Sequence, residues 1–325
     1  MVNMACKICG NDNGNAIVQT KERMLGLNDP FEYLECSVCG CVQLIDIPAD
    51  MQRYYPRDSY YSFKREEESE NPGFSFSKWV RKIQADYKLY DKNKPLGWLF
   101  SLGYVTPGIY HYLRKINAQY DTSILDIGCG NGELLFRLRE IGFRNLTGAD
   151  PFIDGDIRVA GINIVKSDVF GLSGKYDFIM MNHAFEHMDQ PEAILRKTYD
   201  LLADNGCLMI RIPVSDAYGW QKYRDYWVSL DPPRHFYIHS ARSMGILSSK
   251  TGFVIKDLLH DATAFQFWGS EQYLKGIALI AENSYSQNKS KSIFTKAQIE
   301  DYRKRIAVLN ENLQGGDAVF FLAKG

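Results

Sequence analysis

The chain has 325 residues, of which 45% are hydrophobic and 24% charged, an ordinary balance for a globular protein with a sizeable core. Its formal net charge is -1 and no basic stripe stands out, which argues against a duplex nucleic-acid binder. The N-terminus, MVNMACKICG, lacks the apolar core of a secretory signal peptide. Thiols without such a signal indicate a reducing compartment, so we expect a cytoplasmic protein.

Cysteines are concentrated in residues 1–48, which hold five of the seven and which we predict to form a small separate domain. CKIC (6–9) and CSVC (36–39) are two C-x2-C pairs, each followed by a turn-forming glycine, Gly10 or Gly40. Four thiolates satisfy tetrahedral zinc, so the spacing predicts a structural zinc ribbon. The predicted ligands are Cys6, Cys9, Cys36 and Cys39. Redox-active thiols and an iron–sulfur site are the alternatives.

Residues 49–120 are rich in aromatic and charged side chains, and we expect them to form a helical linker and cap. The run KREEESE (64–70) is most simply a solvated loop. The apolar spacing within residues 76–92 predicts an amphipathic helix. Residues 95–113 carry no Asp, Glu, Lys or Arg, but two prolines and three glycines interrupt them. We therefore predict a broken, buried helical cap there, and no membrane span.

Strands and helices alternate from residue 123 to about residue 262, which is typical of a parallel sheet wrapped by helices. The predicted strands are SILDI, NLTGAD, INIVKSD, YDFIMMN, CLMIRIPV, FVIKDLLH and, at the end, DAVFFLAKG. The predicted helices include GELLFRLREIG, PEAILRKTYDLLADNG and residues 295–313, the last in an insertion near 264–316. We therefore predict an α/β fold with a doubly wound, Rossmann-like, seven-stranded sheet over residues 121–325.

A glycine-rich loop follows the first strand, in ILDIGCGNGELLFRL. Ligands of open parallel sheets bind beyond the carboxyl ends of the strands, and Gly128, Gly130 and Gly132 allow a ligand to approach the main chain closely. The spacing G-x-G-x-G, with Asp126 inside the strand, differs from the dinucleotide fingerprint G-x-G-x-x-G, and the Gly-Lys-Ser/Thr of a P-loop is absent. A buried acid beneath the loop suits a ligand with a positively charged amino group.

This region resembles the class I S-adenosylmethionine-dependent methyltransferases, through Asp126, the three glycines and Asp150 at the end of the next strand. The resemblance implies that Asp150 accepts hydrogen bonds from both ribose hydroxyls. It also implies that Asp168, after the third strand, meets the adenine amino group, and that the backbone of Val169 meets the ring. Phe152 packs either on adenine or in the core. Each acid alone also fits a structural role, Asp126 as a loop brace and Asp168 as a turn residue.

The N-terminal region in turn resembles the zinc-binding domain of sugar C-methyltransferases and related polysaccharide-cluster methyltransferases. The resemblance rests on FEYLECSVCGCVQL (31–44) and YYPRDSYYSF (54–63). Few residues follow the sixth predicted strand in this sequence, so we expect no counterpart of the C-terminal domain of the sugar C-methyltransferases. The resemblance therefore implies a glycan-related acceptor, in polysaccharide biosynthesis, rather than C-methylation of a nucleotide sugar.

Two stretches offer a histidine as the base that a hydroxyl acceptor needs. In NHAFEHM (182–188), the resemblance places Asn182 and His183 at the substrate-facing end of the fourth strand, and we also expect Asn182 to contact the cofactor. The pattern H-x-x-E-H there also occurs in inverted zinc proteases, which need both histidines on one helix, contrary to the strand predicted here. We expect Glu186 and His187 to begin the next helix or to brace the loop.

The second stretch is WVSLDPPRHFYIHS (227–240), in a connection that commonly covers the acceptor in this fold. We predict His235 as the base, oriented by Asp231, and Arg234 as a bidentate ligand for a phosphate or carboxylate. A salt-bridged loop is the structural alternative.

The sequence thus predicts transfer of a methyl group from S-adenosylmethionine to a small-molecule or glycan-type acceptor, at oxygen. An RNA methyltransferase is one alternative, which the nearly neutral charge disfavours, so we expect no nucleic-acid partner. A non-catalytic cofactor-binding interaction protein is the other.

Overall fold

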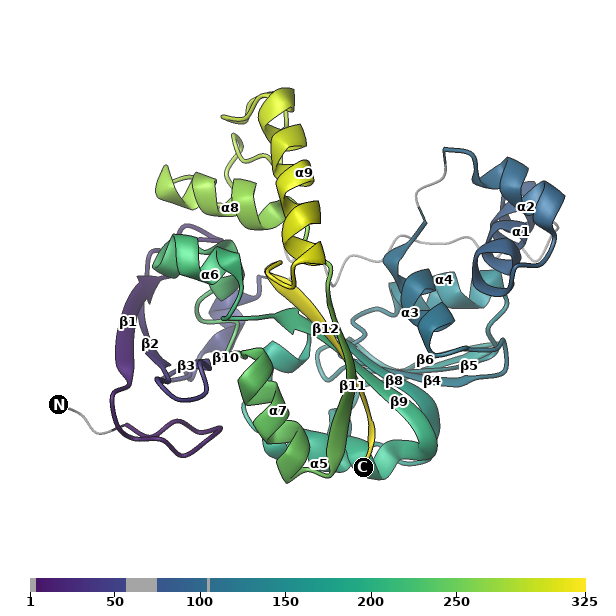
Figure 1. Cartoon of the computed structure of the whole chain (residues 1–325), viewed down its shortest axis with the longest axis horizontal. Helices are drawn as coiled ribbons and strands as arrows, with labels where there is room; N and C mark the ends of the chain where they lie inside the picture. Colours follow the sequence, from purple (N-terminus) through teal and green to yellow (C-terminus); the bar gives the residue numbers. More distant parts are fainter. Residues whose placement is uncertain (1–3, 57–74, 104–105) are drawn as a thin grey trace. The chain divides into compact units, whose positions relative to one another are not determined.

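The computed structural model describes residues 4–56, 75–103 and 106–325 (Figure 1). The loop expected at 64–70 and most of the aromatic stretch at 54–63 lie outside the described residues. The described strands form a four-stranded sheet of order β1-β2-β3-β10 and an eight-stranded sheet of order β11-β12-β9-β8-β4-β5-β7-β6. The predicted α/β class with a doubly wound sheet is confirmed, with one strand more than the seven predicted.

The chain packs as two compact units. The first unit contains residues 1–59, 181–199 and 208–325, and the second contains residues 60–180 and 200–207. The domain boundaries predicted from the sequence, at residues 48 and 120, stay a prediction.

The second unit is built on parallel strands whose side chains are largely buried. In its centre β4 (Ser123–Ile127) pairs in parallel with β5 (Asn145–Ala149) and with β8 (Tyr176–Asn182). Beyond β5 follow β7 (Ile162–Val165) and the short antiparallel β6 (Ile157–Val159). From the central β4 the chain adds β5, β7 and β6 on one side, and then returns to add β8 on the other side. The strand order therefore reverses between β4 and β8, and ligands of open parallel sheets bind at such a point.

Four of the described α-helices belong to the second unit. They are α1 (Phe76–Tyr90), α2 (Lys94–Ser101), α3 (Gly108–Lys115) and α4 (Glu133–Ile141). Helix α4 packs on β5 and β7, while α1 packs against the other three helices. Glycine ends α4: Gly142 adopts a left-handed conformation and its N–H bonds back to the last turn.

The predicted interruption of residues 95–113 is confirmed, since α2 ends at Ser101 and α3 begins after Pro107. The prediction that this segment is buried is wrong for α2. Trp98 is 58% exposed, and Leu96, Leu99 and Leu102 are exposed as well. Helix α2 packs on α1 through Gly97, where a side chain would collide with Tyr87, and its bulky residues point elsewhere. Among the described residues, no helix is long and apolar enough to cross a bilayer.

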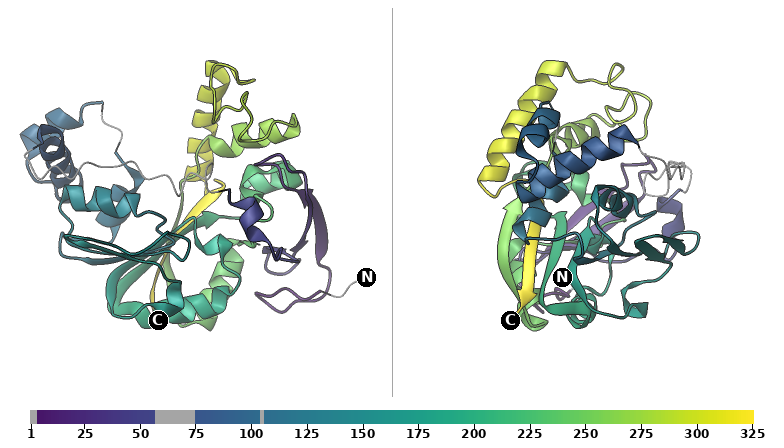
Figure 2. Two further views of the ribbon diagram at one scale, coloured as in Figure 1. Left: turned by 180° about the vertical axis from the view of Figure 1, so that it is seen from behind. Right: turned by 90° about the vertical axis from the view of Figure 1, so that its right-hand side faces the viewer.

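The first unit contains an antiparallel set of strands with helices. Strand β12 (Asp317–Lys324) pairs with β11 (Phe253–His260) and with the end of β9 (Leu202–Pro213). The longer helices are α5 (Pro191–Leu201), α7 (Ala241–Lys250), α8 (Phe265–Leu274) and α9 (Lys296–Glu311), with the short α6 at Tyr218–Tyr223. Figure 2 shows α8 and α9 beside one another. Capping boxes at Ser240 and Thr295 start α7 and α9.

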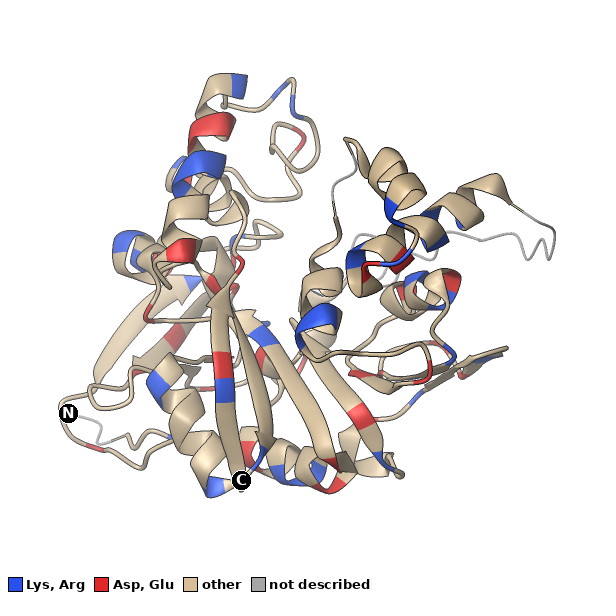
Figure 3. Ribbon diagram, turned by 45° about the vertical axis from the view of Figure 1, so that its right-hand side comes forward, with Lys and Arg blue, Asp and Glu red and all other residues tan. Residues whose placement is uncertain are grey.

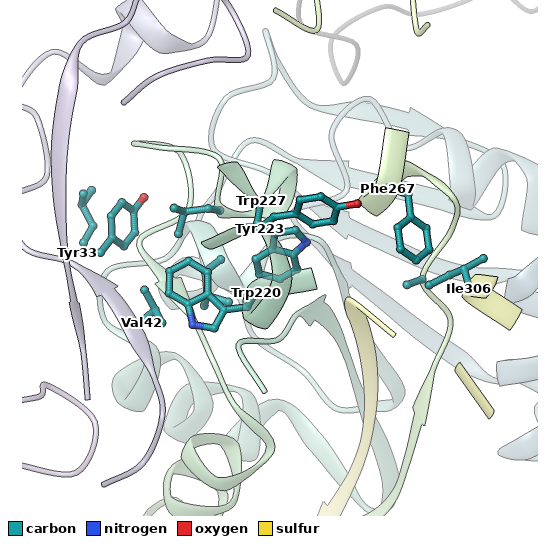
Figure 4. Close-up of a cluster of buried hydrophobic side chains, with 11 residues drawn as sticks. Tyr33, Val42, Trp220, Tyr223, Trp227, Phe267 and Ile306 are labelled. Carbon is teal, nitrogen blue, oxygen red and sulfur yellow. The ribbon is translucent and has the colours of Figure 1, made fainter. Parts of the chain in front are cut away.

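The four-stranded sheet also lies in the first unit. Strands β1 (Ala16–Lys21), β2 (Pro30–Glu35) and β3 (Val42–Leu44) are continued by β10 (Tyr237–Ile238), far along the chain. A buried cluster joins this sheet to α6, α8 and α9, as Figure 4 shows for Tyr33, Val42, Trp220, Phe267 and Ile306. The cysteine-rich segment therefore shares a core with residues of the C-terminal half.

Charged residues of both signs are interspersed along the elements (Figure 3). On α9 they form exposed pairs, with Arg303 Nη1 3.3 Å from Glu300 and Arg305 Nη1 3.6 Å from Asp301. Exposed pairs of this kind contribute little to stability but keep the helix face solvated.

Candidate functional site

The glycine loop between β4 and α4 is held in a shape that requires glycine. Gly128, Gly130 and Gly132 have φ angles of 77°, 53° and 79°, in the left-handed region that side chains disfavour. A Cβ at Gly132 would collide with Ile164 Cδ1. The loop also packs closely on the sheet, because a Cβ at Gly148 in β5 would lie 2.6 Å from Cys129 Sγ. The sequence pattern alone did not single out Gly148.

Two carboxylates lie beneath and beside this loop. Asp126, on β4, is buried, and burial raises its pKa to about 8, with the charge of Asp150 adding to the effect. Asp150 follows β5 and accepts hydrogen bonds from the N–H groups of Gly130 and Phe152, both at 2.9 Å. Each carboxylate oxygen can accept a second bond, so Asp150 keeps capacity for a pair of hydroxyl donors. The main-chain bonds fix its orientation.

The third acid and the predicted adenine contacts are placed after β7 and β5. Asp168 caps a 3₁₀ turn (Val169–Gly171), and one of its oxygens, Oδ1, accepts both Phe170 N–H and Gly171 N–H. It is thus the turn residue that the sequence allowed, and its exposed carboxylate still has acceptor capacity. Val169 is buried. Phe152 is 70% exposed, which rules out the core alternative for this ring.

Asn182 ends β8 and belongs to the first unit. Its Nδ2 is buried and has no hydrogen-bond partner among the described residues. His183 follows in a left-handed conformation, with a φ of 49°. Such a conformation is strained in a residue with a side chain, and strain of this kind concentrates at functional sites.

A buried glutamate connects the two histidine-containing stretches. Glu186 lies in a 3₁₀ turn (Phe185–His187) rather than in the following helix, and its Oε1 is 3.2 Å from His183 Nδ1. Burial alone would raise the pKa of Glu186, but the hydrogen bond from His183 and the nearby histidines lower it to about 2. The Nε2 of His235 lies 4.0 Å from the same Oε1. The structure therefore brings His183 and His235 together around a carboxylate that the sequence pattern suggested only as a brace.

His183 is engaged on both ring nitrogens. Its Nδ1 faces Glu186 and its Nε2 contacts the guanidinium of Arg211. Burial lowers the pKa of His183, but the bond to Glu186 and the charge of Asp317 outweigh burial and raise it above the ordinary value. His183 is positioned by these bonds.

His235 is held as a neutral imidazole. Its Nδ1 is 2.8 Å from the carbonyl oxygen of Ser229, so Nδ1 carries the proton and donates it. Burial and the neighbouring His187 lower the pKa of His235 to about 4. The remaining nitrogen, Nε2, holds a lone pair and faces the carboxylates of Glu186 and Asp231, at 4.0 and 3.9 Å.

Arg234 takes part in a buried ionic network. Its side chain is 0% exposed and its guanidinium contacts Asp231 at 2.5 Å and Glu22 at 2.9 Å, with a further bond to the carbonyl oxygen of Tyr54. The charge of Arg234 lowers the pKa of Asp231 in spite of burial. This geometry favours the salt-bridged loop over binding of an external phosphate or carboxylate. No pattern in the sequence indicated that Glu22 would pair with Arg234, because the two residues lie far apart along the chain.

The four predicted zinc ligands converge. One Sγ atom from each of the four cysteines lies within 4.8 Å of the others. Cys6 Sγ is 3.6 Å from Cys39 Sγ, and Cys9 Sγ is 3.5 Å from Cys36 Sγ. Main-chain N–H groups point at the sulfurs, from Ile8 to Cys6 and from Cys39 to Cys36, both at 3.4 Å. The donor set and its supporting N–H groups fit a tetrahedral zinc ion.

The comparison with known proteins bears on residues 102–258, which match the family model described as a methyltransferase domain. Residues 102–258 are therefore similar to methyltransferase domains. Their fold and their glycine loop agree with the S-adenosylmethionine-dependent class I type.

Individual relatives match this chain over short stretches. A tRNA U34 carboxymethyltransferase of Sulfurimonas denitrificans is 34% identical over 108 residues, covering 30% of this chain and 36% of that protein. An (S)-coclaurine N-methyltransferase of Thalictrum flavum is 26% identical over 111 residues, covering 30% and 31%. The chain spans about a third of the length of these relatives. A solved S-adenosylmethionine-dependent methyltransferase of Archaeoglobus fulgidus has 21% identity and a TM-score of 0.40, covering 70% of this chain and 99% of that one.

Within residues 102–258, the observed side chains fit both the amino group and the adenosine part of S-adenosylmethionine. Asp126 offers a buried carboxylate whose raised pKa would fall beside a cation. The glycine loop leaves its main chain accessible to a ligand. The bond from Gly130 N–H fixes the orientation of the Asp150 carboxylate, which can accept hydrogen bonds from hydroxyl donors. The exposed Phe152 offers a flat apolar surface.

Proposed function

We propose that the chain is an S-adenosylmethionine-dependent methyltransferase that acts on a hydroxyl of a small-molecule or glycan-type acceptor. The cofactor supplies an electrophilic methyl group on a sulfonium. The observation that carries the proposal is the left-handed glycine loop with Asp126 beneath it and Asp150 bonded to Gly130 N–H, inside a matched methyltransferase domain.

The chain's own residues have separate tasks in this proposal. Asp126 neutralises the cofactor's amino group, Asp150 holds the ribose hydroxyls, and Asp168 with the Val169 backbone orients the base. Holding donor and acceptor in line is the main contribution in such a displacement. The acceptor hydroxyl also has to lose a proton, and the neutral Nε2 of His235 is the proposed acceptor of that proton. His183 and Asn182 are the proposed contacts to the acceptor.

Cofactor binding is the direct test. The purified chain should bind S-adenosylmethionine in a calorimetric titration, and Asp150→Ala should weaken binding about 10- to 100-fold, because bonds to a charged acceptor are lost. The exposed Asp121, in the same unit, provides the matched control as Asp121→Ala. Equal affinity in the wild-type chain and the Asp150 variant would remove Asp150 from the site.

The acceptor class requires its own experiment. Nucleotide sugars and glycans are screened for uptake of labelled methyl, and His235→Ala is compared with His260→Ala at the first positive acceptor. The proposal expects slower transfer with His235→Ala at unchanged cofactor affinity. Full activity of that variant would exclude His235 from proton transfer.

An RNA acceptor is the second candidate, because one matching relative is a tRNA-modifying enzyme. RNA binding that falls steeply with added salt would favour it. The formal net charge of -1 gives the chain no general electrostatic attraction to a polyanion such as RNA.

A further inference from the structure

A second group of metal-ligating side chains lies in the first unit, apart from the four cysteines. It consists of Glu186, His187 and His235, and one ligand atom from each lies within 4.8 Å of the others. Glu186 and His187 come from the 3₁₀ turn after β8, and His235 comes from the loop before β10. A main-chain bond from Phe236 N–H to the Glu186 carbonyl, at 2.8 Å, joins the two segments.

Both imidazoles are held in the tautomer that a metal requires. The Nδ1 of His187 is 2.8 Å from the carbonyl oxygen of Arg234, and the Nδ1 of His235 is 2.8 Å from that of Ser229. A carbonyl oxygen accepts hydrogen bonds and does not donate them, so each Nδ1 carries a proton and each Nε2 keeps its lone pair. Histidine ligands of metals typically donate their other N–H to a carbonyl or carboxylate in this way.

The carboxylate has an unsatisfied oxygen. Glu186 is 0% exposed, and its Oε1 is bonded to His183. Its Oε2 is buried and has no hydrogen-bond partner among residues 4–56, 75–103 and 106–325. Leaving a buried carboxylate oxygen without a partner is costly, and a cation is the partner that satisfies it best.

We propose that Glu186 Oε2, His187 Nε2 and His235 Nε2 bind a divalent transition-metal ion. Two imidazoles and one carboxylate form a donor set that zinc and iron(II) accept, and three protein ligands leave coordination positions open. Ligand atoms at about 2.1 Å from a tetrahedral ion lie about 3.4 Å apart. His235 Nε2 already lies 4.0 Å from Oε1 of the same carboxylate. Small side-chain rotations can therefore bring His235 Nε2 and Oε2 to the spacing that an ion requires.

The role of the ion rests on the proposed function. The open position takes the oxygen of the acceptor hydroxyl, whose pKa falls next to the cation. The hydroxyl proton passes to solvent, the oxygen forms a bond to the methyl carbon, and the carbon–sulfur bond of the sulfonium breaks with its electron pair remaining on sulfur. His235 is then a ligand of the ion instead of the base.

Metal content measures the site without reference to activity. The chain is stripped with a chelator, dialysed against zinc and analysed by plasma mass spectrometry. The wild-type chain should hold about one zinc ion more than Glu186→Gln, His187→Gln and His235→Gln, since each lacks one of three ligands. His260→Gln is the control, because the Nδ1 of His260 also bonds a carbonyl oxygen, at 2.7 Å from Gly315, outside the group. Equal zinc in all five proteins would overturn the proposal.

Cobalt(II) gives a second readout on the wild-type chain alone, so that misfolding of a variant does not decide the result. Thiolate ligands produce intense charge-transfer absorption, whereas nitrogen and oxygen ligands produce weak d–d bands. The proposal expects an additional equivalent of cobalt that adds only weak bands, and saturation without that equivalent would contradict it. Calorimetry with S-adenosylmethionine on the same samples separates the two proposals, because a chain that binds the metal but not the cofactor keeps this site and loses the proposed function.

Discussion

The burial of individual acidic residues near the glycine loop and near His183 differs in how far the sequence predicts it. The sequence predicted an acid beneath the loop, and Asp126 is buried there with its pKa raised to about 8. It could be predicted because a carboxyl group is seldom buried in an apolar strand unless it meets a partner or a ligand. Glu186 could not be predicted as a buried partner of His183, because the bond depends on the left-handed turn at His183. The spacing of residues in the sequence predicts neither the left-handed conformation of His183 nor its hydrogen bond to Glu186.

The raised pKa of Asp126 predicts an unusual pH dependence of stability. An unfolded aspartate has a pKa of about 3.9, so between pH 4 and 8 the unfolded chain has lost this proton while the folded chain keeps it. The free energy of unfolding should therefore fall as pH rises through that window. In Asp126→Asn this loss is absent, and the variant should gain about 2 kcal/mol or more on wild type between pH 5 and pH 8.

Urea denaturation at pH 5, 6.5 and 8 measures this difference. Asp121→Asn, at an exposed position in the same unit, should follow the wild-type pH dependence. If Asp126→Asn also follows the wild type across the three pH values, the buried acid is ionised throughout and the raised pKa is wrong.

At the scale of elements, apolar runs and glycines located the strands of the eight-stranded sheet well. Seven of its strands, from β4 to β12, coincide with predicted runs. For the central strands the reason is that a buried parallel strand needs a continuous apolar sequence. Strand β10 was not predicted, since two residues carry no periodicity and its partner β3 lies far away in the sequence. The exposed face of α2 was mispredicted because apolar composition alone does not say what a helix packs against.

The loop before β10 contains a buried ionic network beside its apolar contacts, and Arg234 tests how much that network contributes. Arg234→Ala leaves the carboxylates of Asp231 and Glu22 buried without their cation, and should cost about 3–5 kcal/mol of unfolding free energy. Arg303→Ala, which breaks an exposed pair with Glu300, should cost less than about 1 kcal/mol. Chemical denaturation of the two variants gives the comparison. A stable Arg234→Ala chain that has lost only acceptor binding would instead support Arg234 as an anion ligand.

At the scale of the molecule, the cysteine-rich segment is structurally continuous with the first unit. Strand β3 pairs with β10, Ser240 Oγ donates to the Cys39 carbonyl, and Lys250 Nζ bonds the Ile8 carbonyl at 2.8 Å. The C-x2-C spacing predicted that the four cysteines lie together, because each pair forms its knuckle locally. The attachment to residues 237–250 is non-local and left no pattern in the sequence.

Removal of the zinc ion that the four cysteines are predicted to bind should therefore affect residues well beyond the cysteines. In Cys36→Ser, or after chelation, the knuckles lose the ion that orders them, and β3 loses its fixed register against β10. We expect the melting temperature to fall by about 10 °C and hydrogen exchange to rise at Tyr237 and Ile238 as well as at residues 6–44. Cys207→Ser, outside the cluster, should leave both unchanged. Exchange that rises only within residues 6–44 would show that the ribbon opens by itself, and would support the separate domain expected from the sequence.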